Sequence, residues 1–175
     1  MNLYKELKKI GVAKSGKFIL KSGGVSNLYI DMKKAFGSPE AFRLIVDNLC
    51  GVINKKATCI AGSGHGGLPL ATAVAIRLEL PLILVRDKIK NHGIQKNIDG
   101  YTPTVKDRVV IVDDIFTTGT CVSNMIKILK PTKCRILAGY VVANRGDASE
   151  FRLPIISLLN VEERLLTNSL ESVLN

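Results

Sequence analysis

Two adjacent carboxylates and a threonine-rich turn form the segment of this sequence that is best suited to chemistry. A predicted apolar strand, residues 109–112, ends at Asp113 and Asp114, and a turn of threonines around one glycine then opens a predicted helix. In open α/β sheets, ligands bind beyond the carboxyl ends of the strands, and a helix N-terminus offers unpaired N–H groups to a phosphate. The carboxylates can accept hydrogen bonds from ribose hydroxyls or hold Mg²⁺ through water. Acids that only capped the next helix would explain one carboxylate but not an adjacent pair.

A second glycine-rich turn lies earlier in the chain, at residues 61–69. It follows a predicted strand and precedes a predicted helix, so it offers another set of backbone N–H groups to an anion at the same edge of the sheet. Two such turns suit a substrate with a phosphate at one end and a pyrophosphate at the other. Within this turn, His65 either contacts the pyrophosphate or closes the turn.

The elements that must position these turns alternate along the chain. Ser38 and Pro39 predict the N-cap and first residue of a helix. After that helix, the sequence predicts strands at residues 57–61, 82–85, 109–112 and 135–143, and helices at residues 68–79 and 119–130. Strands that are apolar on both faces are typical of parallel sheets covered by helices on each side. The alternation predicts an α/β fold with a doubly wound, mostly parallel sheet in a single domain, residues 1–175.

The ends of the chain and one long connection depart from this alternation. Residues 3–13 predict an amphipathic helix, and residues 17–20 and 28–32 predict two short strands. The connection at residues 86–108 has no sustained period, so we expect it to be functional or disordered. Near the C-terminus, the apolar run at residues 155–159 precedes a segment that could form a final helix.

The composition indicates a partner with negative charge. The net charge is +10, from 25 basic and 15 acidic residues, and the basic residues are spread along the chain rather than clustered in a tail. No apolar run approaches the roughly 18 residues that cross a bilayer, and residues 1–9 do not resemble a signal peptide, so we expect a cytoplasmic protein without a membrane partner. The cysteines form no CxxC pair, which argues against a zinc site. They are Cys50, Cys59, Cys121 and Cys134.

The segment at residues 109–120 resembles the 5-phosphoribosyl 1-pyrophosphate binding motif of type I phosphoribosyltransferases. The resemblance implies that the acidic pair contacts the ribose hydroxyls and that the threonine-rich loop holds the 5′-phosphate. The residues it assigns to this ligand are Asp113, Asp114, Ile115, Phe116, Thr117, Thr118, Gly119, Thr120 and Cys121. The turn at residues 61–69 resembles the family's pyrophosphate loop, which adds Ser63, Gly64 and His65.

Residues 86–93 are similar to the catalytic loop of orotate phosphoribosyltransferases. Arg86, Lys90 and His92 match that pattern, whereas Asp87 stands where a lysine usually follows the arginine. The resemblance implies that these three cations bind pyrophosphate. It also implies a homodimer in which the loop at residues 86–101 is shared across subunits. Taken alone, the charged run is equally compatible with a solvated loop.

Two further segments resemble the orotate-binding parts of the same family. Residues 18–26 resemble its Phe-x-Leu-Lys-Ser-Gly-x-x-Ser segment, with Lys21 as the lysine, although Gly24 and Asn27 depart from residues common in the family. Asn144-Arg145-Gly146 matches the family's orotate-binding arginine. A guanidinium suits a carboxylate or carbonyl edge. The resemblance therefore assigns orotate to Lys21, Thr117 and Arg145.

Together these matches imply a type I phosphoribosyltransferase fold whose small N-terminal hood is formed by about residues 1–35 and the C-terminal tail. The implied reaction transfers ribose 5-phosphate from 5-phosphoribosyl 1-pyrophosphate to orotate, as in UMP synthesis, without a covalent nucleophile. The implied catalytic residues are Lys21, Lys90, His92, Asp113 and Asp114. The implied cofactor is Mg²⁺, held near Asp113 by pyrophosphate, ribose hydroxyls and water rather than by direct protein ligands.

Two alternatives stay open at the level of sequence. One is a phosphoribosyltransferase for a purine or another base. The other is a non-catalytic regulator that senses the ribosyl pyrophosphate and binds nucleic acid. The sequence contains no predicted helix-turn-helix extension or basic arm, so we expect no nucleic-acid partner.

Overall fold

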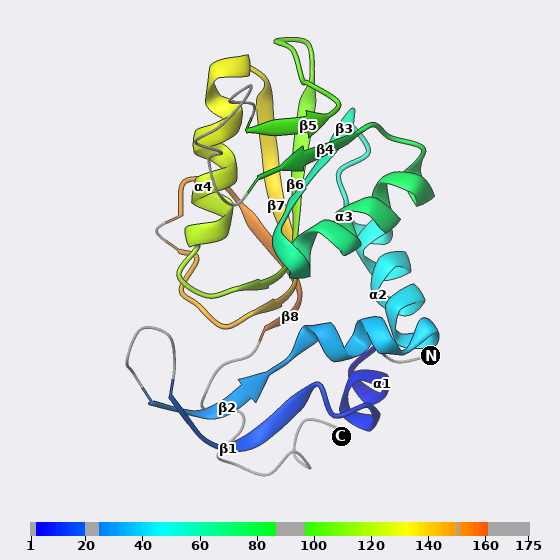
Figure 1. Ribbon diagram of the computed structural model, residues 1–175, viewed down its shortest axis with the longest axis vertical. Coiled ribbons are helices and arrows are strands. Elements are labelled where there is room, and N and C mark those ends of the chain that lie inside the picture. The colour runs from blue at the N-terminus through cyan, green and yellow to red at the C-terminus, as the bar shows by residue number, and fades with distance from the viewer. Residues whose placement is uncertain (1–2, 20–24, 87–96, 150, 161–175) are drawn as a thin grey trace.

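The structure, a computed structural model, describes residues 3–19, 25–86, 97–149 and 151–160, which form two sheets (Figure 1). The larger sheet has six strands in the order β5-β4-β3-β6-β7-β8, and β1 and β2 form a separate two-stranded sheet. The strands are β1 (Ala13–Ile19), β2 (Val25–Ile30), β3 (Cys59–Ser63), β4 (Leu82–Val85), β5 (Ile98–Gly100), β6 (Arg108–Phe116), β7 (Arg135–Asn144) and β8 (Ile155–Asn160).

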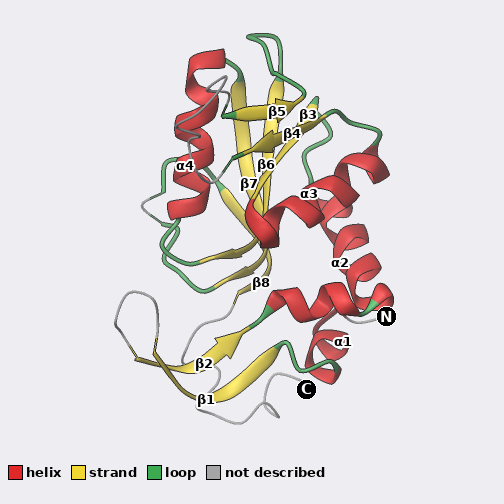
Figure 2. Cartoon of the chain, viewed as in Figure 1, coloured by secondary structure: helices red, strands yellow, loops and turns green. Residues whose placement is uncertain are grey.

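Helices cover both faces of the six-stranded sheet. Helices α2 (Pro39–Val52) and α3 (Gly64–Leu78) lie on one face and α4 (Thr120–Leu129) on the other, and α4 runs into a 3-10 turn, η2 (Lys130–Thr132) (Figure 2). Alternate side chains of β6 enter the two cores, because neighbouring residues of a strand point to opposite faces. Val110 and Val112 pack on the α2–α3 side, and Val109 and Ile111 pack on the α4 side.

Within the larger sheet, β3, β4, β6, β7 and β8 pair in parallel and only β5 is antiparallel. The predicted doubly wound, mostly parallel fold is therefore confirmed. The predicted helix cap is also present, since Ser38 Oγ accepts a hydrogen bond from the backbone N–H of Ala41 at 3.3 Å. The C-terminal apolar run is β8, whereas the segment proposed for a final helix lies outside the described residues.

The N-terminal part forms a small layer below the C-terminal ends of β6 and β7 (Figure 1). It consists of α1 (Leu3–Lys9), the antiparallel pair β1 and β2, and the 3-10 helix η1 (Met32–Gly37). Helix α1 is shorter than the predicted 3–13, because Gly11 at φ +67° turns the chain and Val12 bonds back to Leu7. The two strands of this layer also begin earlier than predicted.

Two elements beside the predicted anion-binding turns begin or end beyond their predicted bounds. Strand β6 continues through the acidic pair to Phe116, because β7 supplies partners such as Ala143 for Ile115. Helix α3 begins at Gly64 rather than at residue 68, so the second glycine-rich turn is the first turn of a helix. The carboxylates therefore belong to a strand, and the glycines to a helix that starts beside it.

The long connection after β4 contains the short strand β5, which the sequence did not predict. The backbone N–H of Arg86 donates to the carbonyl of Asn97 at 3.0 Å, and β4 and β5 pair from there to Gly100. Gly100 has φ +69°, and a Cβ there would stand 2.7 Å from the carbonyl oxygen of Leu82. Residues 87–96 lie outside the described residues. Among the described residues, no helix has the length and apolar character needed to cross a bilayer.

Candidate active site

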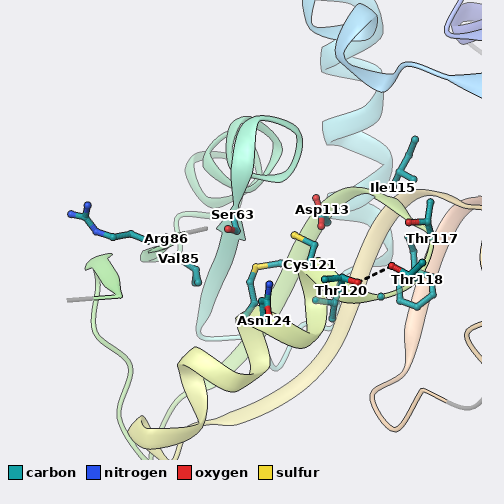
Figure 3. Close-up of a pocket in the computed structure, with 14 residues that line it drawn as sticks. Ser63, Val85, Arg86, Asp113, Ile115, Thr117, Thr118, Thr120, Cys121 and Asn124 are labelled. Carbon is teal, nitrogen blue, oxygen red and sulfur yellow. Dashed lines mark hydrogen bonds between the residues drawn. The ribbon is translucent and has the colours of Figure 1, made fainter. Parts of the chain in front are cut away.

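A pocket of about 420 Å³ opens at the C-terminal ends of β3, β4 and β6, beside the start of α4 (Figure 3). It is lined by Ser63, Val85, Arg86, Asp113, every residue from 115 to 122, Asn124 and Met125. The pocket thus joins one carboxylate of the acidic pair, the threonine-rich loop and the first residue after β4. These groups were predicted to meet at this edge of the sheet.

Gly119 shapes the threonine-rich loop. It has φ +71°, which favours glycine, and it forms the N-cap of α4. A Cβ at this position would stand 2.7 Å from the ring of Phe151 and 3.0 Å from that of Phe116, and the two rings pack edge to face with centroids 5.4 Å apart. Gly119 therefore packs against two aromatic rings at the start of α4, and the first residues of this helix line the pocket, where a helix N-terminus can bind an anion.

The threonine side chains form the outer wall of this loop. Thr117, Thr118 and Thr120 are all exposed, and the hydroxyls of Thr118 and Thr120 are hydrogen-bonded at 2.8 Å (Figure 3). One hydroxyl of the pair donates to the other, so the second proton stays available to an anion. The loop can therefore offer both backbone and hydroxyl donors to a phosphate.

Asp113 lies on the pocket side of β6 and is only 4% exposed. One carboxylate oxygen accepts the backbone N–H of Asp114 at 2.9 Å, and the thiol of Cys121 also hydrogen-bonds to this carboxylate. Burial raises the pKa of Asp113 to about 7, with a further rise from the neighbouring Asp114 charge, while the Cys121 hydrogen bond opposes both. A carboxyl group with this pKa changes charge near neutral pH.

Asp114 points toward α3 instead of the pocket. Its carboxylate accepts the backbone N–H of Ile115 at 2.9 Å and lies directly against Gly66, where a Cβ would overlap its oxygens. The next glycine, Gly67, lies against Asp113, since a Cβ there would stand 2.6 Å from Asp113 Oδ1. The start of α3 can therefore sit on the acidic pair only because two successive residues lack side chains.

Arg86 stands at the mouth of the pocket, where the chain leaves β4. Its guanidinium pairs with Asp99 of β5 at 2.5 Å, and Figure 3 shows it pointing away from the threonine-rich loop. Its Nε is buried and has no hydrogen-bond partner among the residues that the structure describes, so this N–H donor is unsatisfied within that part of the chain. The ion pair fixes the base of the loop whose ends are Arg86 and Asn97.

The residues predicted for the acceptor base fall into two groups. Thr117 lines the pocket, and the backbone N–H of Arg145 donates to the carbonyl of Phe116 at 2.9 Å. Gly146 packs so closely on the carbonyl of Thr117 that a Cβ would overlap it. The turn containing Arg145 is therefore held beside the threonine-rich loop. Lys21 lies outside the described residues, as do Lys90 and His92 of the predicted catalytic loop.

Four of the predicted ligand-binding residues that the structure describes do not line the pocket: Asp114, Gly64, His65 and Arg145. His65 is exposed in the first turn of α3, so it does not close a turn within the structure. Conversely, sequence reasoning missed Asn124 and Asp99. Asn124 follows Thr120 by four residues, and helical spacing alone would have placed both on one face of α4. Asp99 has no comparable signal, because its role depends on the pairing of β4 with β5.

The described residues provide carboxylates but no compact metal cage. Among residues 3–19, 25–86, 97–149 and 151–160, no three His, Cys, Asp or Glu side chains come together in a way that could hold a metal ion.

Comparison with known proteins gives a consistent result. Residues 25–160 match the model of the phosphoribosyl transferase domain. The orotate phosphoribosyltransferase of Aeropyrum pernix is 36% identical over 150 residues, which cover 84% of this chain and 80% of that protein. The orotate phosphoribosyltransferase of Methanocaldococcus jannaschii is 36% identical over 162 residues, which cover 90% of this chain and 92% of that protein.

Solved structures extend the similarity to three dimensions. The crystal structure of the Aeropyrum pernix orotate phosphoribosyltransferase superposes with a TM-score of 0.83 at 32% identity, covering 95% of this chain and 97% of the other. An adenine phosphoribosyltransferase from Thermoanaerobacter pseudethanolicus has a TM-score of 0.71 at 18% identity, covering 91% of this chain and 100% of the other. That likeness shows a shared fold alone.

The contact between Gly66 and Asp114 predicts a reversal in the effect of alanine. In an ordinary helix, Gly→Ala stabilises by about 0.5–1 kcal/mol, but Gly66→Ala should destabilise the fold by about 1–3 kcal/mol, because the new Cβ overlaps the carboxylate. In an Asp114→Ala background the same change should become neutral or stabilising. Urea denaturation of the four proteins measures this coupling. Gly51→Ala in α2, with no atom within 4 Å of its Cβ, is the control and should stabilise; equal effects of Gly66→Ala in both backgrounds would contradict the contact.

The raised pKa of Asp113 predicts how stability depends on pH. The folded protein holds this proton up to about pH 7, whereas the unfolded chain releases it near 3.8. Asp113 therefore reduces stability as pH rises from about 4 and has no further effect above about 7. Between pH 5 and 8 the unmodified protein should lose about 2 kcal/mol more stability than Asp113→Asn, as measured by urea denaturation. Asp147→Asn is the control: its Ser149 hydrogen bonds lower the pKa of Asp147, so it should not alter the slope.

Proposed function

The chain belongs to the orotate phosphoribosyltransferases, enzymes of pyrimidine biosynthesis, and we propose that its pocket joins orotate to the ribose of 5-phosphoribosyl 1-pyrophosphate with release of pyrophosphate. The observation that carries this proposal is the convergence of Asp113, the threonine-rich loop and Arg86 on one pocket. A carboxylate for ribose hydroxyls, donors for a 5′-phosphate and a cation for pyrophosphate are thereby arranged around a single ligand.

The 5′-phosphate occupies the loop above Gly119, where helix N–H groups and threonine hydroxyls supply donors. The ribose hydroxyls then face the carboxylate of Asp113, and the pyrophosphate extends toward Ser63 and Arg86. The buried Nε of Arg86, which has no partner among the described residues, supports this placement. Asp114 serves the site from behind, by fixing the contact between β6 and α3.

Orotate lies on the other side of the ribose, beside Thr117. The turn at Arg145 is bonded to Phe116 and packed on Thr117, so a guanidinium can approach the base from there. By resemblance, Lys21 completes this part of the site. A carboxylate of orotate needs cationic partners, and the proposal assigns that role to Arg145 and Lys21.

Catalysis requires no covalent nucleophile. Breaking the C1–O bond develops positive charge at C1 of the ribose, as in glycoside hydrolysis, while negative charge develops on pyrophosphate. Holding N1 of orotate against C1 supplies proximity, and Arg86, Lys90 and His92 stabilise the departing pyrophosphate. His92 is the side chain able to donate a proton to it near neutral pH.

Mg²⁺ fits this site as a cofactor carried largely by the substrate. Magnesium commonly takes one or two carboxylates and otherwise phosphate oxygens and water, and the pocket offers the Asp113 carboxylate without a closed cage. Bound there, the ion would neutralise charge on the pyrophosphate. Asp113 would orient the ribose hydroxyls and the ligand water around it.

The proposal also includes the assembly and location of the enzyme. By resemblance, we propose a homodimer whose loop at residues 86–101 is shared across subunits. A single domain, residues 1–175, would carry the site, with a hood from about residues 1–35 and the C-terminal tail. We place the enzyme in the cytoplasm.

An acceptor assay tests the activity. With Mg²⁺ and 5-phosphoribosyl 1-pyrophosphate, the protein should consume orotate, followed by loss of its ultraviolet absorbance, and should not use hypoxanthine or adenine. Asp113→Asn should lower kcat/KM for the ribosyl pyrophosphate by about 100-fold or more, since it removes about 3 kcal/mol of interaction with the ribose. Turnover of a purine without turnover of orotate would contradict the acceptor assignment.

The loop that follows Arg86 generates a ranking of variants. Lys90→Ala and His92→Ala should each lower kcat by about 10²–10³-fold, because they remove charge or a proton donor from the departing pyrophosphate. Asp87→Ala should leave kcat unchanged or raise it, since it removes an anion from a pyrophosphate-binding loop. Steady-state kinetics of the three variants measures the order. If Asp87→Ala proved the most damaging, the roles assigned within this loop would be wrong.

A further inference from the structure

Basic side chains that are spread along the sequence gather at one edge of the folded protein. Residues 54–58, 105–108 and 127–135, here called the basic edge, hold eight of the 25 basic residues and one of the 15 acidic ones. These 18 residues carry a net charge of +7, whereas the other 157 carry +3. The basic excess of this protein is therefore largely a property of one surface.

The three segments of the basic edge are joined by hydrogen bonds at the N-terminal ends of β3, β6 and β7. The backbone N–H of Thr58 donates to the carbonyl of Arg108 at 2.8 Å, and the side-chain Nε of Arg108 donates to the carbonyl of Lys56 at 2.5 Å. Arg108 and Arg135 are register partners on neighbouring strands. Figure 1 shows these strand ends and the C-terminal end of α4 together, opposite the two-stranded sheet.

The positive charge of this edge is not neutralised by the acid within it. Asp107 is buried, and its carboxylate accepts hydrogen bonds from Thr104, Tyr101 and Thr58 at 2.7–3.0 Å. It therefore clamps two of the segments together without pairing with a cation. Lys9, Arg77 and Arg86, which form ion pairs with carboxylates, all lie outside the edge. All eight cations of the edge are exposed: Lys55, Lys56, Lys106, Arg108, Lys127, Lys130, Lys133 and Arg135.

Substrate binding does not account for this charge. On β6, Arg108 of the basic edge lies at the N-terminal end, and the threonine-rich loop follows Phe116 at the C-terminal end. At about 3.3 Å per residue, the strand separates them by roughly 25 Å. The Debye length at physiological ionic strength is about 8 Å, so these charges are screened from a phosphate in the pocket. A second anionic partner is needed to use them.

In contrast to the expectation from sequence of no nucleic-acid partner, we propose that the basic edge binds the phosphate backbone of RNA, independently of the transferase activity. Its cations lie across the ends of adjacent strands, about 4.8 Å apart, and such a row fits a linear polyanion that carries one charge per nucleotide. Within these segments Val105 is the one large apolar side chain that is exposed, which leaves no apolar face for insertion into a membrane. Recognition by a row of cations is through phosphate charge and is independent of base sequence.

The test is fluorescence anisotropy. A labelled RNA of mixed sequence, about 20 nucleotides long, is titrated with the protein at KCl concentrations from about 50 to about 300 mM. Binding should be micromolar at the low end and should weaken with a log–log salt slope of about −3 to −5, the value for some four to seven phosphates on a single strand. Absence of binding at the lowest salt would overturn the proposal.

A charge-reversal variant and a matched control locate the surface. Lys56→Glu, Lys106→Glu and Lys133→Glu together should weaken RNA binding by at least about 30-fold and flatten the salt slope by about 2. The control reverses three exposed cations elsewhere, Lys8, Lys33 and Arg43, with the same change in net charge, and should bind within about threefold of the unmodified protein. Equal losses in both variants would reduce the effect to net charge and overturn the proposal.

Further measurements keep the outcomes distinct. The corresponding glutamine variants at positions 56, 106 and 133 provide a milder change if the glutamate triple variant fails to fold. Orotate turnover should be the same in the unmodified protein and both variants, so loss of the proposed activity would be seen separately from loss of RNA binding. Binding to phosphatidylglycerol vesicles without binding to RNA would show that the partner class is wrong.

Discussion

The contact between the start of α3 and the end of β6 is the constraint on which the site depends. Two adjacent carboxylates must be held at a strand end, and a helix must begin beside them to leave its N-terminus near the pocket. Gly66 and Gly67 make this possible because a Cβ on either would collide with Asp114 or Asp113. The close approach buries Asp113, and burial is the main reason for its raised pKa. Packing and electrostatics at this site therefore have one origin.

Local sequence signals predicted the alternation of elements well and their ends less well. The bounds of β4 were predicted as observed, and the helix after Ser38 begins with the predicted cap. The predicted end of β6 was wrong, because pairing with β7 extends the strand by four residues. The residue pattern within β6 does not reveal this pairing with another strand. Strand β5 was missed for the same reason, since its three residues are defined by pairing with β4.

The site was predictable where a side chain and its neighbours in sequence act together. The loop from Ile115 to Cys121 lines the pocket as a continuous segment, so reading it as one unit was sufficient. The acidic pair was less simple. Residues adjacent on a strand point to opposite faces: Asp113 lines the pocket and Asp114 does not, although both lie against the start of α3. That division follows from the strand extending past residue 112, which depends on tertiary pairing.

The distribution of positive charge also depends on the fold and is not apparent along the chain. The basic residues of the edge come from three segments between residues 54 and 135, and they meet because parallel strands place their N-terminal ends together. The same parallel arrangement gathers the ligand-binding turns at the opposite edge. Because the two edges are separated by the length of β6, well beyond a Debye length, a polyanion at one edge and a ribosyl pyrophosphate at the other would not compete. One sheet can therefore carry two anion-binding surfaces at its two edges. The carboxylates of Asp113 and Asp114 lie at the edge that holds a ribose and not at the edge that holds a phosphate chain.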